Sequence, residues 1–271
     1  MYINFNNSTP MRNYQRFKLA TQKSKQVTDQ CFERNIKTLM HTETFIIHTA
    51  VQISTIGTVL LFSIPNYSVA SLIIWGLIYT FLLIQFFSSW FLAWRADPGR
   101  IDIIPINEVP KAESTPTYCA KCNSYRPAGA KHCSMCNRCT ADFDHHCPWV
   151  LNCVGRGNYF YFCKYIFYGF ATEVFSNVCG LISLLKKEFG ANLNLNWAQM
   201  KTAYFVTLGF NLFGTAFLAV MLVAHLGMIL RGIGTNQKLN MKRVGQQLPK
   251  MRINNIKIRL GKSWLKRLLW M

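Results

Sequence analysis

Hydrophobic residues in this chain gather into four long runs instead of alternating with polar ones. Each run reaches or exceeds the roughly 20 apolar residues that an α-helix needs to cross the hydrocarbon core of a bilayer. The runs lie at residues 45–64, 70–94, 159–185 and 204–230. The pattern therefore predicts a mostly α-helical, polytopic membrane protein with four transmembrane helices.

Two of the predicted spans contain polar residues that weaken the pattern. The first span contains His48 and Gln52, and the third contains Lys164 and Glu173. For each of these two runs, a buried core helix is the alternative interpretation. Four spans are still the more economical prediction, and the second and fourth runs are more uniformly apolar than the first.

Positive charge along the chain predicts the orientation of the spans. Lys and Arg number seven before the first span, eight in 95–158 and eleven in 231–271, but none in 65–69 and three in 186–203. Because basic loops mark the cytoplasmic side of a membrane, both termini and the long central loop are predicted to face the cytosol. Residues 1–40 are polar and basic and lack an apolar stretch followed by a cleavage site, so no signal peptide is expected.

The formal net charge of +19 favours contact with anionic membrane lipids over binding to nucleic acid. The excess is concentrated beside the spans and in the C-terminal tail, and no nucleic-acid-binding motif accompanies it. The tail segment INNIKIRLGKSWLKRLLWM interleaves basic with apolar residues. That pattern predicts an amphipathic segment lying on the membrane, with a disordered basic tail as the alternative.

The central loop concentrates residues that bind metal ions. Between Cys119 and Cys153 it holds seven cysteines and three histidines, including two Cys-x2-Cys pairs typical of zinc knuckles. Cysteines that face the reducing cytosol are more often metal ligands or reactive thiols than disulfides. Two tetrahedral zinc ions use eight ligands, so one cysteine and one histidine are left over if each site is Cys3His.

The direction of neighbouring side chains narrows the choice of ligands. Where the chain is extended, adjacent side chains point to opposite faces. His132 and Cys133 are therefore predicted to bind different ions, which implies interleaved sites. By the same rule His145 and Cys147 share one face and His146 lies on the other. If His146 is a ligand, His145 and Cys147 are the pair left over.

A cysteine beside an unligated histidine is an arrangement typical of a nucleophile and its general base. The thiolate is the reactive form of the thiol, and a neighbouring imidazole can take the proton. Asp144 is the next residue along the chain and could orient or charge the imidazole of His145. A structural hydrogen bond is the alternative role for His145, and a turn cap is the alternative role for Asp144.

These motifs resemble the DHHC family of protein S-acyltransferases, also called palmitoyltransferases. The similarity is close through residues 119–162, where it covers both knuckles, the sequence DHHCPW at 144–149 and Asn152-Cys153-Val154-Gly155. A second family mark is Asp97-Pro98-Gly99, directly after the second predicted span. The family's plan also has four spans, with the cysteine-rich loop between the second and third.

The resemblance implies which residues bind each zinc ion and which carry the chemistry. One ion would be held by Cys119, Cys122, His132 and Cys139, and the other by Cys133, Cys136, His146 and Cys153. Cys147 would accept a fatty acyl group from acyl-CoA, with His145 as general base and Asp144 polarising it. The acyl group would then pass to a cysteine of a substrate protein. Trp149 and Thr235 are expected to contact substrate, although Trp149 could instead be an interfacial anchor.

One stretch departs from the family pattern. The family commonly carries Thr-Thr-x-Glu after the fourth span, where this chain reads Gly234-Thr235-Asn236-Gln237. A membrane adaptor that has lost catalysis is therefore one alternative, and an acyl-CoA thioesterase is another.

The endoplasmic reticulum or Golgi is expected as the location rather than the plasma membrane. The predicted segments are a cytosolic tail at 1–44, spans at 45–94, a cytosolic two-zinc domain at 95–158, spans at 159–230 and a cytosolic tail at 231–271.

Overall fold

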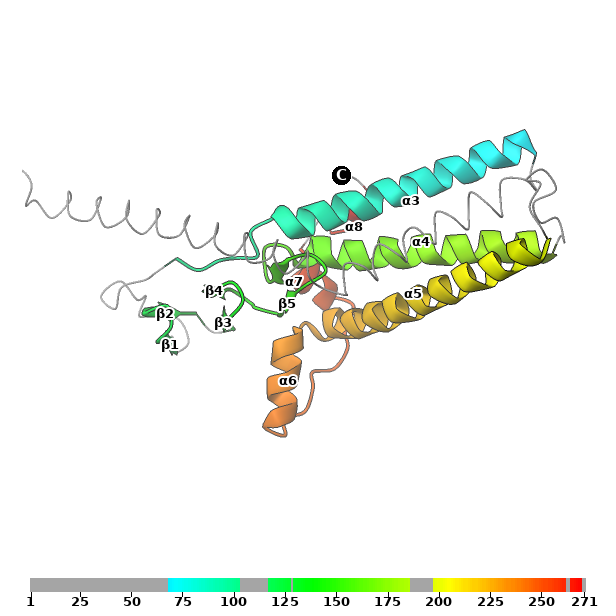
Figure 1. Ribbon diagram of the computed structural model, residues 1–271. Coiled ribbons are helices and arrows are strands. Elements are labelled where there is room, and N and C mark those ends of the chain that lie inside the picture. Colours follow the sequence, from blue (N-terminus) through cyan, green and yellow to red (C-terminus); the bar gives the residue numbers. More distant parts are fainter. Residues whose placement is uncertain (1–67, 103–116, 128, 186–196, 262–263, 270–271) are drawn as a thin grey trace, which may run out of the picture. The chain divides into compact units, whose positions relative to one another are not determined.

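The computed structural model describes residues 68–102, 117–127, 129–185, 197–261 and 264–269, and the chain divides into two compact units (Figure 1). The hairpin unit contains Asp97–Gly157. The helical unit contains the described residues on both sides of it, 68–96 and 158–269. The domain boundaries expected from the sequence stay a prediction.

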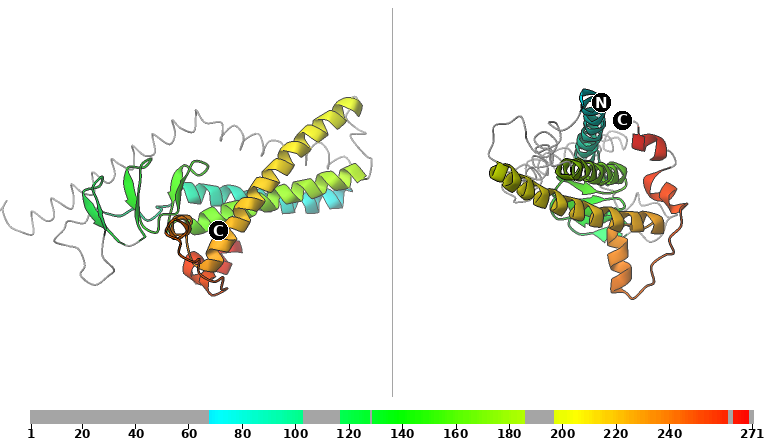
Figure 2. Two further views of the ribbon diagram at one scale, coloured as in Figure 1. Left: turned by 90° about the horizontal axis from the view of Figure 1, so that it is seen from below. Right: turned by 90° about the vertical axis from the view of Figure 1, so that its right-hand side faces the viewer.

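Three long helices form the helical unit, and the central one, α4, packs against both of the others (Figures 1 and 2). Their bounds are α3 (Val69–Arg95), α4 (Tyr159–Leu185) and α5 (Trp197–Arg231). The stretches long and apolar enough to cross a membrane are Val69–Arg95, Tyr159–Ile182 and Phe205–Arg231. They match the second, third and fourth predicted spans. The first, at 45–64, lies outside the described residues, so the count of four stays a prediction.

The bounds of α3 follow from its sequence. Ser68 caps the first turn by accepting a hydrogen bond on its hydroxyl from the backbone N–H of Ser71 at 3.3 Å. The helix ends at Arg95 with Ala96 as its C-cap, and Pro98 follows, where the ring and the missing N–H cannot continue a helix. Large apolar side chains stay exposed along it, among them Ile73, Leu77, Ile84 and Phe91. Such a surface suits acyl chains of a bilayer.

The polar residues of α4 are buried inside the helical unit. Lys164 is 1% exposed and Glu173 is 0% exposed, and Thr172 and Ser176 are also fully buried. The ammonium of Lys164 lies 5.6 Å from the centre of the Tyr168 ring. Ionisable residues within membrane helices face the bundle interior in this way. The polar residues that weakened the third predicted span are therefore compatible with a membrane helix.

The chain after α5 returns to pack on the end of that helix. It forms three short helices, α6 (Thr235–Arg243), α7 (Asn255–Leu260) and α8 (Trp264–Leu269). The backbone N–H of Arg252 and the amide of Asn255 both donate to the carbonyl of Leu230, at 2.7 and 2.8 Å. The guanidinium of Arg259 stacks 4.0 Å from the centre of the Tyr159 ring. At least part of the predicted amphipathic tail thus packs against protein.

Three two-stranded antiparallel hairpins follow one another in the hairpin unit (Figure 2). Their strands are β1 (Thr117–Cys119) with β2 (Ser124–Arg126), β3 (Lys131–Cys133) with β4 (Arg138–Thr140), and β5 (His145–Cys147) with β6 (Asn152–Val154). A single two-stranded hairpin is at best marginally stable in water. Strands of three residues therefore need additional links to hold this unit together.

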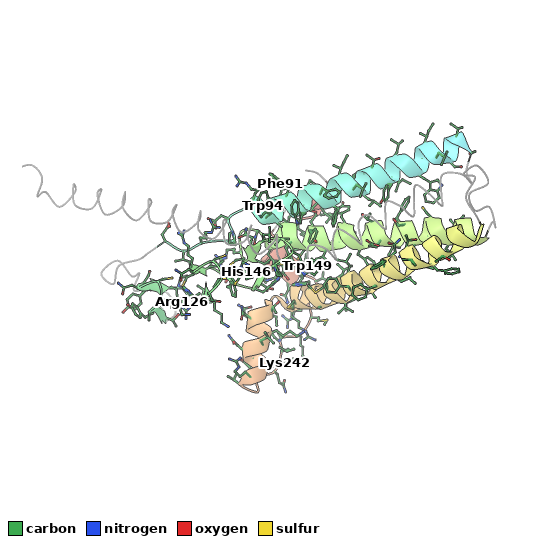
Figure 3. All side chains as sticks on the ribbon, viewed as in Figure 1. Phe91, Trp94, Arg126, His146, Trp149 and Lys242 are labelled. Carbon is green, nitrogen blue, oxygen red and sulfur yellow. The ribbon has the colours of Figure 1, made fainter. Side chains whose placement is uncertain are left out.

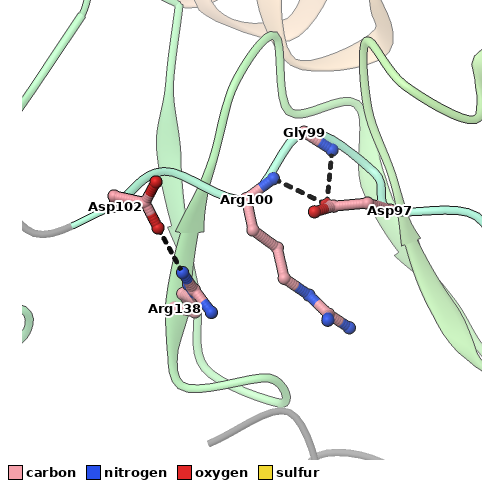
Figure 4. Close-up of polar contacts among 5 residues, drawn as sticks. All are labelled: Asp97, Gly99, Arg100, Asp102 and Arg138. Atoms are coloured by element: carbon pink, nitrogen blue, oxygen red, sulfur yellow. Dashed lines mark hydrogen bonds and ion pairs between the residues drawn. The ribbon is translucent and has the colours of Figure 1, made fainter. Parts of the chain in front are cut away.

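The Asp97-Pro98-Gly99 tripeptide attaches the chain that leaves α3 to the middle hairpin. The carboxylate of Asp97 accepts hydrogen bonds from the backbone N–H groups of Gly99 and Arg100, at 2.9 and 2.8 Å (Figure 4). The carbonyl of Gly99 then accepts from the backbone of Ala141 at 2.7 Å. An ion pair between Arg138 and Asp102, 3.2 Å apart, extends this attachment along β4 (Figure 4).

Gly155 and Gly157 allow the segment after β6 to pass close to this tripeptide. A Cβ atom on Gly155 would lie 2.4 Å from the carbonyl oxygen of Pro98, and one on Gly157 would lie 2.1 Å from that of Asp97. Both contacts are with backbone, which cannot turn aside as a flexible side chain can. Only glycine therefore fits at either position without moving the tripeptide.

We expect Gly157→Ala to destabilise the hairpin unit by roughly 3 kcal/mol, the upper part of the range for overpacking. The measurement is thermal unfolding of the purified full-length protein, followed by the release of bound metal. Gly209→Ala in α5 is the matched control, because its Cβ would meet no atom within 4 Å. Equal unfolding temperatures for the two variants would contradict the predicted contact.

Candidate metal centres and nucleophile

The three hairpins share one plan of ten residues. Each has a strand of three residues, a turn of four and a second strand of three, and they start at residues 117, 131 and 145, so each start lies 14 after the last. The final turn residue is left-handed in all three, with φ of 50° at Asn123, Asn137 and Leu151. The same backbone is thus built three times, and the side chains at matching positions can be compared directly.

Ligand-type side chains from successive hairpins meet in two clusters. In each cluster, the donor atoms of all members lie within 4.8 Å of one another. The clusters are Cys119, Cys122, His132 and Cys139, and Cys133, Cys136, His146 and Cys153. These are the two sets that the family resemblance implied.

Hairpin register explains the membership of each cluster. His132 pairs across the strands with Cys139, and His146 pairs with Cys153, so each histidine shares a face with one cysteine. The other two members come from the Cys-x2-Cys turn of the preceding hairpin. Each cluster therefore links two consecutive hairpins.

The distances within the clusters fit a tetrahedral zinc ion. Bonds of about 2.0 Å to nitrogen and 2.3 Å to sulfur place the ligand atoms roughly 3.6 Å apart. In the first cluster, the Nδ1 atom of His132 lies 3.2 Å from the sulfur of Cys122 and 3.7 Å from that of Cys119. In the second, Nδ1 of His146 lies 3.6 Å from the sulfurs of both Cys133 and Cys136. Both donor sets are Cys3His, a common structural zinc set.

Cys147 and His145 lie outside both clusters and interact with each other. They flank His146 on β5, so strand alternation turns both away from the second cluster. A side-chain hydrogen bond joins Cys147 to His145. Cys147 is 2% exposed, whereas the side chain of His145 keeps 28% of its surface exposed.

Asp144 orients His145 from the other side of the ring. Its buried carboxylate lies 3.0 Å from Nδ1 of His145, which leaves Nε2 as the nitrogen available to the thiol of Cys147. Burial lowers the pKa of His145, but the hydrogen bonds to Asp144 and Cys147 outweigh it and raise that pKa to about 9. The arrangement can hold a proton taken from the thiol, as a nucleophile and base pair must.

Comparison with known proteins points to one family. The family model described as "DHHC palmitoyltransferase" matches residues 112–242. Residues 112–242 are thus similar to the DHHC palmitoyltransferase family. Among curated DHHC relatives, Palmitoyltransferase ZDHHC17 of Mus musculus is 31% identical over 174 residues, which cover 56% of this chain and 26% of the relative.

Two further DHHC relatives match shorter stretches. Palmitoyltransferase ZDHHC17 of Danio rerio is 42% identical over 85 residues, 28% of this chain and 14% of the relative. Palmitoyltransferase ZDHHC8 of Homo sapiens is 36% identical over 130 residues, 46% of this chain and 16% of the relative. In these matches the chain spans about a quarter or less of the length of its relatives.

The two predicted substrate contacts lie in different units of this chain. Trp149 is half-buried in the turn between β5 and β6, on the hairpin that also carries His146 (Figure 3). Thr235 begins α6 in the helical unit, and its hydroxyl lies 3.4 Å from the sulfur of Met228. Contact of either residue with substrate stays a prediction.

The stretch that departs from the DHHC family pattern keeps one structural role. The side-chain oxygen of Gln237 accepts a hydrogen bond from the backbone N–H of Gly234 at 3.0 Å, and so caps the start of α6. Glutamine and glutamate perform this reach-back interchangeably at the third position of a helix. Gln237 therefore makes a cap that a glutamate at this position could also make.

A buried polar contact at the start of α4 escaped the sequence analysis. The hydroxyl of Tyr159 lies 3.1 Å from Nδ1 of His225 on α5, and Arg259 stacks on the same tyrosine ring. Next to it, the amide of Asn158 donates to the carbonyl of Ala93 on α3 at 3.0 Å. The residues in these contacts lie far apart along the chain, so no local sequence pattern indicates that they are partners.

Proposed function

We propose that this chain is a protein S-acyltransferase that moves a fatty acyl group from acyl-CoA to cysteines of substrate proteins through a thioester on Cys147. The observation that carries the proposal is the arrangement of Asp144, His145 and Cys147. They lie on a hairpin that the second cluster of candidate metal ligands links to the preceding hairpin. The match of residues 112–242 to the DHHC palmitoyltransferase model and the names of the relatives support the same reaction.

The reaction has two transfers at one sulfur. His145 takes the proton of Cys147, and the thiolate attacks the thioester carbonyl of acyl-CoA, so that coenzyme A leaves as a thiolate and is protonated. A thiolate of the substrate protein then attacks the Cys147 thioester, and the sulfur of Cys147 leaves and recovers its proton. Asp144 holds the imidazole in the tautomer that this exchange requires.

Two zinc ions are proposed to be structural in this enzyme. The Cys3His clusters supply eight protein ligands, which fill two tetrahedral ions and leave no position for a reactive water. Zinc bound there would fix the hairpins that carry Cys147 and its base.

The membrane supplies the setting for the substrates. Acyl-CoA is an amphiphile, so its thioester lies near the membrane interface, and each CH2 group of the tail buried among the spans contributes about 0.8 kcal/mol. Trp149 and Thr235 are the proposed substrate contacts. The expected location is the endoplasmic reticulum or Golgi, with both termini in the cytosol, where the substrate cysteines would lie.

Intact-protein mass spectrometry tests this function directly. The purified full-length protein is incubated with palmitoyl-CoA, and we expect one added acyl group on the peptide that contains Cys147, removable by neutral hydroxylamine. Adding a cysteine-containing substrate protein should move the label to that protein. Label that is lost to water alone would indicate a thioesterase, and no label at all would indicate an adaptor.

His145→Ala is expected to slow self-acylation by about 100-fold or more, because general-base help to the thiol is lost. The measurement is the single-turnover rate of label incorporation, together with the zinc content. Zinc should stay at the wild-type level, since His145 lies outside both clusters. Asp144→Ala should slow the reaction less, because an imidazole without its carboxylate can still accept a proton. An unchanged rate in His145→Ala would exclude this residue as the base.

A further inference from the structure

The hairpin that carries Cys147 repeats the backbone of the two zinc knuckles. Counting from the first strand residue, the third position is Cys119, Cys133 and Cys147 in the three hairpins. The sixth position is Cys122 and Cys136 in the first two but Val150 in the third. Cys147 thus stands where the other hairpins place the first cysteine of a knuckle.

The second knuckle cysteine is replaced by an apolar residue that is completely buried. Val150 is 0% exposed, and Cys147 is as deeply buried as the cluster cysteines Cys133 and Cys153. The third turn also ends in the same left-handed conformation as the others, at Leu151 instead of asparagine. The third hairpin therefore keeps the shape of a knuckle and one of its two sulfurs.

The clusters show what a third metal site would lack. Each cluster takes two cysteines from the turn of one hairpin, and a histidine and a cysteine from the next. In the described chain no further hairpin follows β6, because the chain enters α4 at Tyr159. Cys147 therefore has no following hairpin to complete its set.

His145 could supply a second ligand, because its ring is hydrogen-bonded to a carboxylate as in many metal-binding histidines. Metal-binding histidines commonly donate their other ring nitrogen to a carboxylate, which fixes the ring and raises its basicity. The Nδ1 atom of His145 makes this contact with the buried carboxylate of Asp144 at 3.0 Å, and Cys147 is hydrogen-bonded to the same histidine. One sulfur and one oriented imidazole nitrogen thus face each other without belonging to either cluster.

We propose that Cys147 and His145 form a third metal site, of lower affinity than the two clusters, which takes a divalent zinc ion and thereby blocks the nucleophile reversibly. Two protein ligands instead of four make the site weaker, and water completes the coordination. Metal binding itself does not depend on the acyl transfer proposed above. Only its consequence, inhibition, rests on that function.

Cobalt titration of the zinc-loaded, full-length protein tests the site. Co²⁺ binds more weakly than Zn²⁺ to the same ligands, so it does not displace zinc from the two clusters, and a bound thiolate gives it a charge-transfer absorption. We expect one further cobalt per chain with this absorption. Cys147→Ala should abolish the signal, whereas Cys163→Ala, a change of a partly exposed cysteine on α4, should keep it.

Completing the knuckle should strengthen the site. Val150→Cys adds a second sulfur at the sixth hairpin position and is expected to lower the dissociation constant for Co²⁺ at least about tenfold. Val150→Ala is the matched control, because it removes the same bulk without adding a ligand, and it should bind no more tightly than wild type. No cobalt absorption in wild type, or equal affinity in Val150→Cys and Val150→Ala, would overturn the third site.

Inhibition is measured separately from binding. Added Zn²⁺ should reduce the rate of self-acylation at least tenfold, and brief EDTA treatment that leaves two zinc ions per chain should restore it. Cobalt binding by a protein that shows no self-acylation in metal-free buffer would uphold the site and count against the proposed function. Normal self-acylation in excess zinc would overturn the inhibitory role.

Discussion

Cys147→Ser is expected to reduce self-acylation from palmitoyl-CoA to the background level while leaving two zinc ions per chain. A hydroxyl at this position ionises far less readily than a thiol, so the same imidazole cannot generate an equivalent nucleophile. The zinc content should hold because Cys147 belongs to neither cluster and its strand keeps His146 in place. The measurement is hydroxylamine-labile label on the intact protein, with zinc determined by elemental analysis.

Cys163→Ser provides the matched control for this result. Cys163 is a partly exposed thiol on α4 and the next cysteine along the chain after the cluster cysteines, so it is the alternative acceptor to test. Its replacement should leave the rate unchanged. Wild-type labelling of Cys147→Ser would place the nucleophile elsewhere and would remove the basis for the proposed roles of His145 and Asp144.

Loss of one ligand of the second cluster is expected to cost more function than loss of one ligand of the first. Structural zinc contributes about 10–16 kcal/mol to the folding of small zinc peptides, far more than three-residue strands provide. The second cluster links the β3–β4 hairpin to the hairpin of Cys147, and the first links it to β1–β2. Cys136→Ala should therefore lower zinc to one ion or less per chain and abolish self-acylation.

Cys119→Ala separates metal loss from damage to the nucleophile. It should also lower the zinc content, from two to one ion per chain, but leave the second cluster and the Cys147 hairpin joined. We therefore expect measurable self-acylation in Cys119→Ala and none in Cys136→Ala. Equal activities, or two zinc ions in Cys136→Ala, would contradict the assignment of ligands to sites.

Local patterns in the sequence were sufficient for the main elements. Long apolar runs predicted α3, α4 and α5 because a span must be apolar along its whole length. Alternation along an extended chain predicted which residues of the His145-His146-Cys147 run would face together, since that depends only on the pleat. Both predictions used properties of consecutive residues.

Contacts between distant residues could not be predicted in the same way. The Asp97-Pro98-Gly99 tripeptide is evident in the sequence as a motif. Its hydrogen bond to Ala141 depends on the folded backbone, and so does the steric overlap that a side chain at position 157 would have with it. The stacking of Arg259 on Tyr159 is of the same kind. The threefold hairpin plan, in contrast, has a local signal in the sequence. Cys119, Cys133 and Cys147 are equally spaced, which becomes evident only when the three motifs are compared with one another.

The buried polar residues of α4 have a consequence for how the protein is made. A charged residue at the centre of an isolated helix costs about 2.5–3.5 kcal/mol during insertion, so Glu173, near the middle of α4, opposes release of that helix alone into lipid. In the folded protein Glu173 is fully buried, and α4 packs against both α3 and α5. Because α5 emerges from the ribosome last of the three, α4 is expected to wait beside α3 at the translocon until its second neighbour arrives.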